Sequence, residues 1–134
     1  MDVNKLLVCL AWAKLELAAP AEAAQLAAQA VRRLRADTLR RALAGALRVQ
    51  AMVALRQGQW AAAEQCLEEG LALARAMSYP YGEGRLLEVY GRLHRDRGEP
   101  APARERLAEA LSVFRRLGAR KDIELTEQLL TTIS

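Results

Sequence analysis

The sequence predicts an all-α fold built from stacked two-helix units. Alanine, leucine, arginine and glutamate dominate its 134 residues, aromatic residues make up 4%, and β-branched residues are few, which is a composition typical of helices. A spacing of 40 residues recurs, from Ala18 to Gly58 and from Gly58 to Gly98. Within each period the apolar residues follow helical spacing, as at Leu86 and Tyr90. Two-helix units that repeat in this way form solenoids.

The same offset aligns small and apolar residues on both sides of each predicted turn. The aligned positions are Leu7, Leu47 and Leu87; Ala11, Ala51 and Gly91; Ala23, Ala63 and Ala103; Ala30, Gly70 and Ala110; and Val31, Leu71 and Leu111. Gly58 and Gly98 supply the left-handed residue that ends a helix, and Pro20 and Pro100 suit the first turn of the next one. These features predict helices at residues 2–17, 20–35, 38–57, 60–77, 81–97, 100–117 and 120–132.

Two segments are predicted to separate the units, residues 35–38 and residues 77–80. Asp37 in the first segment, and either Ser78 or Tyr79-Pro80 in the second, are suitable to begin the helices that follow. We therefore expect a single domain over residues 1–134, with helix-turn-helix repeats at about 2–36, 37–77 and 78–118 and a capping helix at 119–134.

The third unit resembles the tetratricopeptide repeat (TPR) family. The residues that carry the resemblance are Leu87, Tyr90, Gly91, His94, Gly98, Ala103, Leu107, Ala110 and Leu111. The second unit is similar, with departures at Gln50 and Ala54, and the first is a weaker match because Ala18 replaces the turn glycine. The resemblance implies an alpha-alpha superhelix, in which small side chains let neighbouring helices cross closely.

The period of 40 residues exceeds the 34 that is usual for these repeats. Longer units of this kind resemble the repeat arrays of MalT-like and LuxR-like transcription regulators and of related bacterial signal-transduction ATPases. The ATPase and DNA-binding modules of those proteins have no counterpart in these 134 residues, so neither activity is expected of this sequence.

The resemblance implies a concave surface lined by the first helix of each repeat. The predicted partner-binding groove consists of Lys5, Val8, Trp12, Arg48, Met52, Arg56, Arg85, Glu88, Arg92 and Arg95, with Glu16 and Asp96 on the same face. Basic residues outnumber acidic ones on this face by six to three. An acidic protein or peptide with a hydrophobic anchor would complement it.

Another interpretation of these charges remains open. Glu88 with Arg92, and Arg92 with Asp96, are spaced as i, i+4 pairs on a solvated helix face. Trp12 likewise is either a binding anchor or a residue packed beneath a segment that precedes this chain. The N-terminal helix, with Leu6, Leu7 and Leu10, lacks an evident cap, which predicts a homo-oligomer or an additional neighbour.

The predicted function is that of a non-catalytic protein-binding scaffold, and we expect no cofactor and no metal. His94-Arg95-Asp96 spells a kinase tripeptide, but it lies in mid-helix without the other kinase motifs. Two alternatives remain: a ligand-sensing segment of a larger regulator, and nucleic-acid binding, for which the net charge of +4 is the argument. Nucleic acid is disfavoured because the basic face lacks interleaved aromatic residues.

The remaining features are typical of a cytoplasmic protein. Cys9 and Cys66 have no CxxC spacing and no nearby histidine, which excludes a disulfide framework and a zinc site and predicts reduced, buried thiols. Lys5 precedes a short apolar run, but Lys14 and Glu16 interrupt the helix, so we expect neither a secretion signal nor a membrane span.

Overall fold

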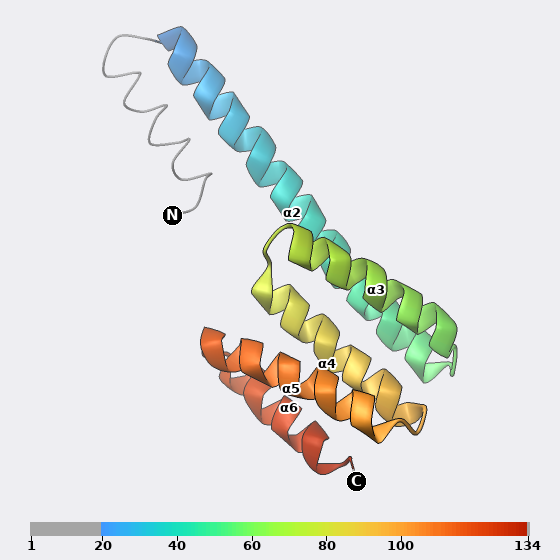
Figure 1. Ribbon diagram of the computed structural model, residues 1–134. Helices are drawn as coiled ribbons and strands as arrows, with labels where there is room; N and C mark the ends of the chain where they lie inside the picture. Colours follow the sequence, from blue (N-terminus) through green and yellow to red (C-terminus); the bar gives the residue numbers. More distant parts are fainter. Residues whose placement is uncertain (1–19, 134) are drawn as a thin grey trace. The chain divides into compact units, whose positions relative to one another are not determined.

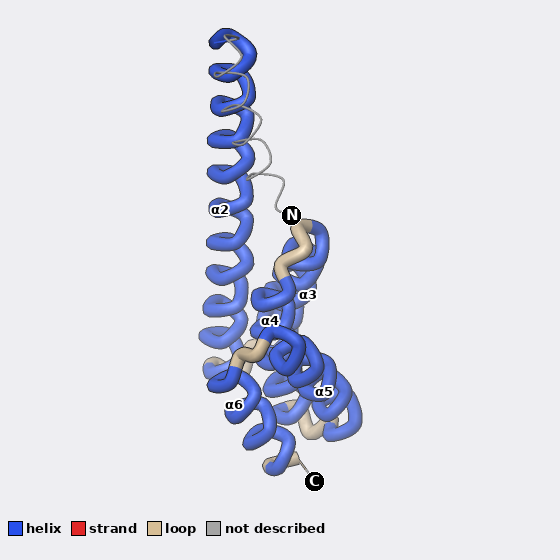
Figure 2. The backbone as a smooth tube through the Cα atoms, turned by 90° about the vertical axis from the view of Figure 1, so that its left-hand side faces the viewer, coloured by secondary structure: helices blue, strands red, loops and turns tan. Residues whose placement is uncertain are grey.

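The computed structural model describes residues 20–133. They form helices α2 (Pro20–Arg56), α3 (Trp60–Ala76), α4 (Pro80–Asp96), α5 (Pro100–Leu117) and α6 (Arg120–Thr131). Over these residues the backbone is helix and short turns, with no strand (Figure 2). The chain divides into two compact units between Leu39 and Arg40. The second unit, which carries the C-terminal part of α2 and the four helices after it, holds the residues discussed below.

The turns between the helices contain the predicted left-handed glycines, and prolines lie at the starts of helices. Gly58 and Gly98 adopt φ values of 70° and 76°, a left-handed conformation that glycine enters without steric cost. Pro80 and Pro100 occupy the first turns of α4 and α5, where a missing N–H leaves no intrahelical bond unmade. From residue 60 onward, each predicted helix therefore begins and ends within one residue of the observed bounds.

The predicted break at residues 35–38 is wrong, because α2 runs through this segment as one helix of 37 residues. The segment contains neither glycine nor proline. The hydroxyl of Thr38 donates to the carbonyl oxygen of Leu34 at 2.8 Å, a bond that threonine makes within a helix. Asp37, the predicted start of a new helix, lies inside α2.

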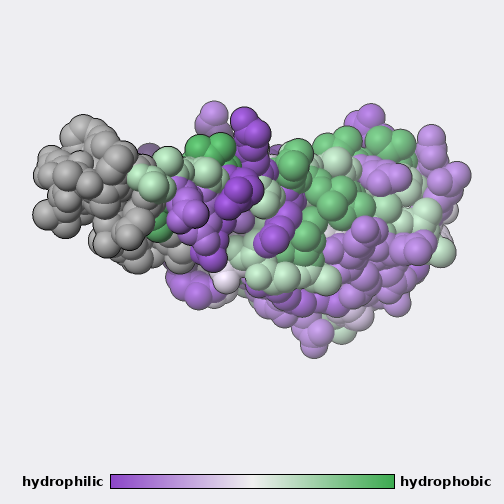
Figure 3. Space-filling view, turned by 90° about the horizontal axis from the view of Figure 1, so that it is seen from above, coloured by the Kyte–Doolittle hydropathy of each residue, from purple (hydrophilic) through white to green (hydrophobic). Residues whose placement is uncertain are grey.

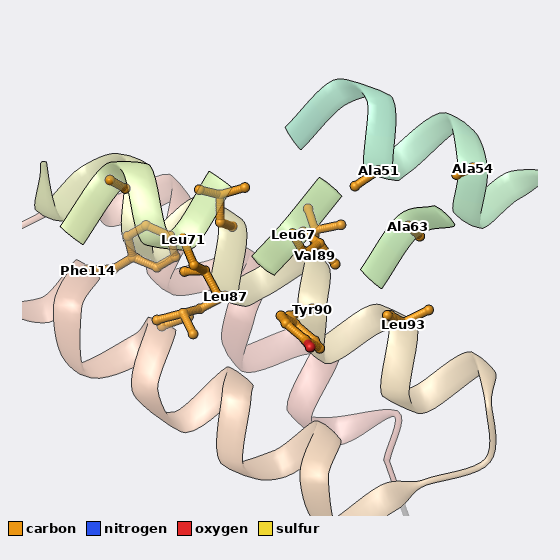
Figure 4. Close-up of a cluster of buried hydrophobic side chains, with 13 residues drawn as sticks. Ala51, Ala54, Ala63, Leu67, Leu71, Leu87, Val89, Tyr90, Leu93 and Phe114 are labelled. Atoms are coloured by element: carbon orange, nitrogen blue, oxygen red, sulfur yellow. The ribbon is translucent and has the colours of Figure 1, made fainter. Parts of the chain in front are cut away.

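In the second unit, α3 packs on α4, α4 on α5 and α5 on α6 (Figure 1). Small residues lie at the points where two helices cross. A Cβ atom added to Gly91 on α4 would lie 2.5 Å from Cγ of Leu107 on α5, and Ala63 and Ala103 are fully buried. Large buried side chains, among them Leu67, Tyr90 and Phe114, fill the space between the helices (Figure 4). The result is an all-α array of the predicted TPR-like kind.

Helix α6 covers the C-terminal end of the array. Thr126 is fully buried, and its hydroxyl donates to the carbonyl oxygen of Asp122 at 2.7 Å. The Tyr81 hydroxyl on α4 donates to the Asp122 carboxylate at 3.0 Å, and Ile123 packs against the core. These contacts attach α6 to the end of the array, although Thr126 is the residue that it buries fully.

None of the helices described at residues 20–133 has the length and apolar character that a bilayer span requires. Residues 2–17, the first helix of the first predicted repeat, lie outside the described residues. The division into a single domain with three repeats therefore stays a prediction.

Candidate functional site

The predicted groove residues divide between two parts of the chain. Lys5, Val8 and Trp12, with Glu16, lie outside the described residues. The others lie on two helices of the second unit, and we call this set the arginine groove: Arg48, Met52 and Arg56 on α2, and Arg85, Glu88, Arg92 and Arg95 on α4. Spacings of three and four residues place each set on one face of its helix.

One end of the arginine groove is a cavity of about 200 Å³ between α2 and α4. Its lining combines apolar and charged side chains: Met52, Leu55, Arg56, Arg92, Arg95 and Asp96. Met52 and Leu55 are half-buried and pack against the core. Arg95 also borders a second cavity, of about 320 Å³, with Pro100 and Ile133. This end therefore offers an apolar surface with arginines beside it.

The other end of the groove brings Arg48 and Arg85 together. Both line a smaller depression of about 30 Å³, with Arg41 and Tyr79. Burial lowers the pKa of Arg48, and the positive charge of Arg85 lowers it further. Nη1 of Arg48 lies 3.2 Å from Sδ of Met52, which links the two ends of the groove.

Between the two ends, Glu88 is buried, at 6% exposed. Its Oε1 lies 2.5 Å from Nε of Arg92. The contact is ionic and lacks hydrogen-bond geometry, so Oε1 and Nε are buried polar atoms without a hydrogen-bond partner. A carboxylate buried this deeply needs a cation beside it. Arg92 therefore has a structural role as well as a place in the groove.

The interpretation of these charges as pairs on a solvated face is wrong for Glu88, which is buried. Arg92 is the predicted partner of Asp96, but the structure pairs Asp96 with Arg95, at 3.3 Å between Oδ1 and Nε. The arginine groove with Asp96 contains five arginines and two carboxylates, a net charge of +3. The described part of the groove is therefore positive, as the sequence indicates.

Sequence reasoning missed the tyrosine at the edge of this groove. The guanidinium of Arg85 lies 5.5 Å from the ring centre of Tyr81, within the range of a cation–π contact. The same ring packs edge-on against Phe114, at 6.1 Å between centroids. Tyr81 precedes Arg85 by four residues, so helical spacing was the signal that could have placed them on one face.

A second polar cluster surrounds Tyr90, whose hydroxyl donates to Glu64 at 3.2 Å and to Glu68 at 2.5 Å. Burial, then the bond to Glu68, raises the pKa of Tyr90. The partly buried ring of His94 stacks on the Tyr90 ring, with 5.1 Å between the ring centroids. Glu68 is an exposed residue, and its carboxylate accepts the hydrogen bond of this tyrosine hydroxyl.

The described residues contain no group of three histidine, cysteine or acidic side chains arranged to hold a metal ion. Cys66 is a free, half-buried thiol packed against the core, whereas Cys9 lies outside the described residues.

The family profile described as Tetratricopeptide repeat matches residues 39–116, which is more than half of the chain. The protein therefore belongs to the tetratricopeptide repeat family. Repeats of this family mediate protein–protein interaction, and its members are typically non-catalytic scaffolds. Neither a curated protein nor a solved structure matches the chain significantly.

Proposed function

We propose that the arginine groove binds an acidic peptide segment of a partner protein, anchored by one hydrophobic side chain. The observation that carries the proposal is the cavity of about 200 Å³ in which Met52 and Leu55 lie beside Arg56 and Arg95. The apolar residues suit an anchor, and the arginines suit carboxylates on either side of it.

The charges of the groove support an acidic partner over a basic or neutral one. Burial and the nearby positive charge of Arg85 lower the pKa of Arg48, and an incoming carboxylate would offset both effects. Glu88 contributes little negative potential because Arg92 neutralises it. Arginine forms bidentate bonds to carboxylates, which gives orientation as well as attraction.

Peptide selection followed by affinity measurement tests the proposal. A random peptide library displayed on phage is selected against the full chain, and we expect enrichment of sequences with acidic residues flanking a leucine, methionine or aromatic residue. Fluorescence anisotropy with the best peptide then measures Kd. Arg56→Glu with Arg95→Glu should weaken binding by about tenfold or more, equal to about 1.4 kcal/mol.

The design leaves Arg92 unchanged, because its loss would leave the buried Glu88 without a cation. The matched control is Arg104→Glu with Arg116→Glu, two exposed arginines on α5, which changes the net charge equally and should leave Kd unchanged. Selection of peptides without acidic residues, or equal weakening by both double variants, would contradict the proposal.

We further propose that the chain is the protein-binding part of a larger bacterial signalling regulator of the MalT-like class, acting in the cytoplasm. The supporting observation is that α3 and α5 begin 40 residues apart, at Trp60 and Pro100. The full reading frame and the neighbouring genes test this. A ligand-sensing role would instead appear as a thermal shift with a metabolite, worth about 2.7 kcal/mol at 100 times its Kd.

A further inference from the structure

Three arginines line one small depression, at the end of the arginine groove where Arg48 and Arg85 meet. The depression lies between α2 and the start of α4, and the described residues that line it include Arg41, Gly45, Arg48, Tyr79, Gly82 and Arg85. The rest of the described lining is two alanine and leucine residues, so none of it is acidic. All of these residues lie in the compact unit that begins at Arg40. The depression therefore gathers three positive charges within one unit of the chain.

Aromatic rings orient two of these arginines without cancelling their charge. The guanidinium of Arg41 lies 5.1 Å from the ring centre of Tyr79. The guanidinium of Arg85 lies 5.5 Å from the ring centre of Tyr81. A guanidinium that stacks on a ring still presents its N–H groups at its edge, where they can donate to a ligand. Stacking thus positions both side chains for an anion.

The third arginine, Arg48, is also held by a neutral group. Its Nη1 lies 3.2 Å from Sδ of Met52, and a thioether sulfur is only a weak acceptor. Burial lowers the pKa of Arg48, and the charge of Arg85 lowers it further. Glu88 acts in the opposite direction, but its carboxylate is already paired with Arg92. A ligand with negative charge would therefore stabilise the charged form of Arg48.

Two glycines leave room at this site. A Cβ atom added to Gly45 would meet no atom within 4 Å, whereas one added to Gly82 would lie 2.5 Å from Cδ2 of Tyr79. The Tyr79 ring can therefore lie against α4 only because residue 82 has no side chain. Glu83, the acidic residue in the first turn of α4, is paired with Arg75, at 3.0 Å between Oε1 and Nε.

We propose that this depression binds the phosphoryl group of a phosphorylated serine or threonine in the peptide that occupies the arginine groove, an inference that rests on the proposed function. Phosphoserine carries a charge of about −1.5 to −2 and three acceptor oxygens. These match three guanidinium groups better than the single charge of a carboxylate does. The volume of about 30 Å³ is far below the roughly 150 Å³ of a cavity that holds benzene, so the site has no room for an aromatic ring as well.

The positions of the depression and the apolar cavity predict a spacing within the peptide. On α2, Gly45 lies at the depression, and Met52 and Arg56 lie at the cavity. At about 1.5 Å per residue these positions are about 10–16 Å apart along the helix. An extended peptide spans about 3.3 Å per residue, so the phosphorylated residue should lie about three to five residues from the hydrophobic anchor. Hydrophobic residues reach the surface in patches among the hydrophilic ones (Figure 3).

Fluorescence anisotropy with matched peptides and the full chain tests the proposal. The probe is a labelled peptide with one leucine between glutamates and a variable position about four residues away, made with serine, aspartate or phosphoserine there. The phosphoserine peptide should bind about tenfold more tightly than the serine peptide. The aspartate peptide should fall between them, because it adds a single charge. Phosphoserine directly beside the leucine should gain much less.

Arg41→Gln separates this inference from the proposed function, because Arg41 lies outside the arginine groove. This substitution should remove most of the preference for phosphoserine and leave the Kd of the serine peptide unchanged. Arg40→Gln is the matched control: Arg40 is the adjacent exposed arginine and is not among the described residues that line the depression. It should keep the full preference.

The outcomes distinguish the two proposals. If the serine peptide binds but phosphoserine adds nothing, this inference is wrong and the proposed function stands. If neither peptide binds, both are wrong. Equal losses with Arg41→Gln and Arg40→Gln would show only general attraction between opposite charges and would also overturn the inference.

A labelled single-stranded RNA tests another source of phosphate. We expect weak binding that falls steeply with added salt and is the same for Arg41→Gln and Arg40→Gln. RNA binding that depends on Arg41, together with no preference for phosphoserine, would assign the depression to a nucleic-acid backbone and refute the proposal.

Discussion

Replacing Gly91 by alanine tests the close crossing of α4 and α5. The added Cβ atom would lie 2.5 Å from Cγ and 2.7 Å from Cδ2 of Leu107, and 3.4 Å from the carbonyl oxygen of Ala103. Cγ is the branch point of a fully buried side chain, so the contact cannot be relieved by moving a flexible tip. The helices must separate slightly or Leu107 must leave its rotamer.

Two opposing contributions determine how much Gly91→Ala changes the free energy of unfolding. Alanine in a helix interior is favoured over glycine by about 1 kcal/mol, whereas overpacking a closely packed core costs about 1–3 kcal/mol. We therefore expect Gly91→Ala to lower the free energy of unfolding by about 1 kcal/mol, with an upper limit near 2 kcal/mol. The corresponding decrease in Tm is about 4 °C for a chain of this size.

Gly45 provides a matched control, because it also lies inside a helix but a Cβ atom there would meet no atom within 4 Å. Gly45→Ala should raise the free energy of unfolding by about 1 kcal/mol, since only the propensity term remains. Urea unfolding followed by circular dichroism measures both variants. Stabilisation by both substitutions would refute the close crossing at Gly91. In a Leu107→Ala background, Gly91→Ala should lose its cost.

Tyr90→Phe should lower the free energy of unfolding by about 1 kcal/mol at neutral pH, because the hydroxyl bonds to Glu64 and Glu68 are lost. The raised pKa of Tyr90 means that the folded chain keeps the phenolic proton to higher pH than the unfolded chain. The associated stability is fully present below about pH 10 and is lost as the pH rises, so urea titrations should show a smaller alkaline loss for Tyr90→Phe. Arg92→Ala should destabilise the chain by about 2 kcal/mol, because it leaves the buried Glu88 carboxylate without its cation. Urea midpoints should show recovery when Glu88→Gln is added, and an unchanged midpoint for Arg92→Ala alone would contradict the structural role of this pair.

The periodicity predicted the helices of the second unit well because each of their turns contains an explicit stop residue. Gly58 and Gly98 end one helix at the same register, and Pro100 begins the next. The break at residues 35–38 was predicted from the repeat alone, where no such residue exists. Local preference for a helix prevailed there.

Helical spacing places the described groove residues on one face of each helix, because helical geometry fixes which side chains point the same way. It did not predict the burial of Glu88 or the pairing of Asp96 with Arg95, because both depend on packing between helices. The contacts of Tyr81 with Phe114 and Asp122 depend on packing between helices in the same way. Its place beside Arg85 follows instead from their i, i+4 spacing, a local signal that the groove prediction did not use. Whether the groove binds a partner stays a prediction.

The stacked order of helices has a consequence for how the second unit opens. Because α3 to α6 contact mainly their neighbours along the chain, local opening can begin at the end of the stack and leave the remainder folded. Helix α6 buries Thr126 alone, whereas α4 buries nine residues. Amide hydrogens of α6 should therefore exchange with solvent first and those of α4 last, a gradient that runs inward from the C-terminal helix.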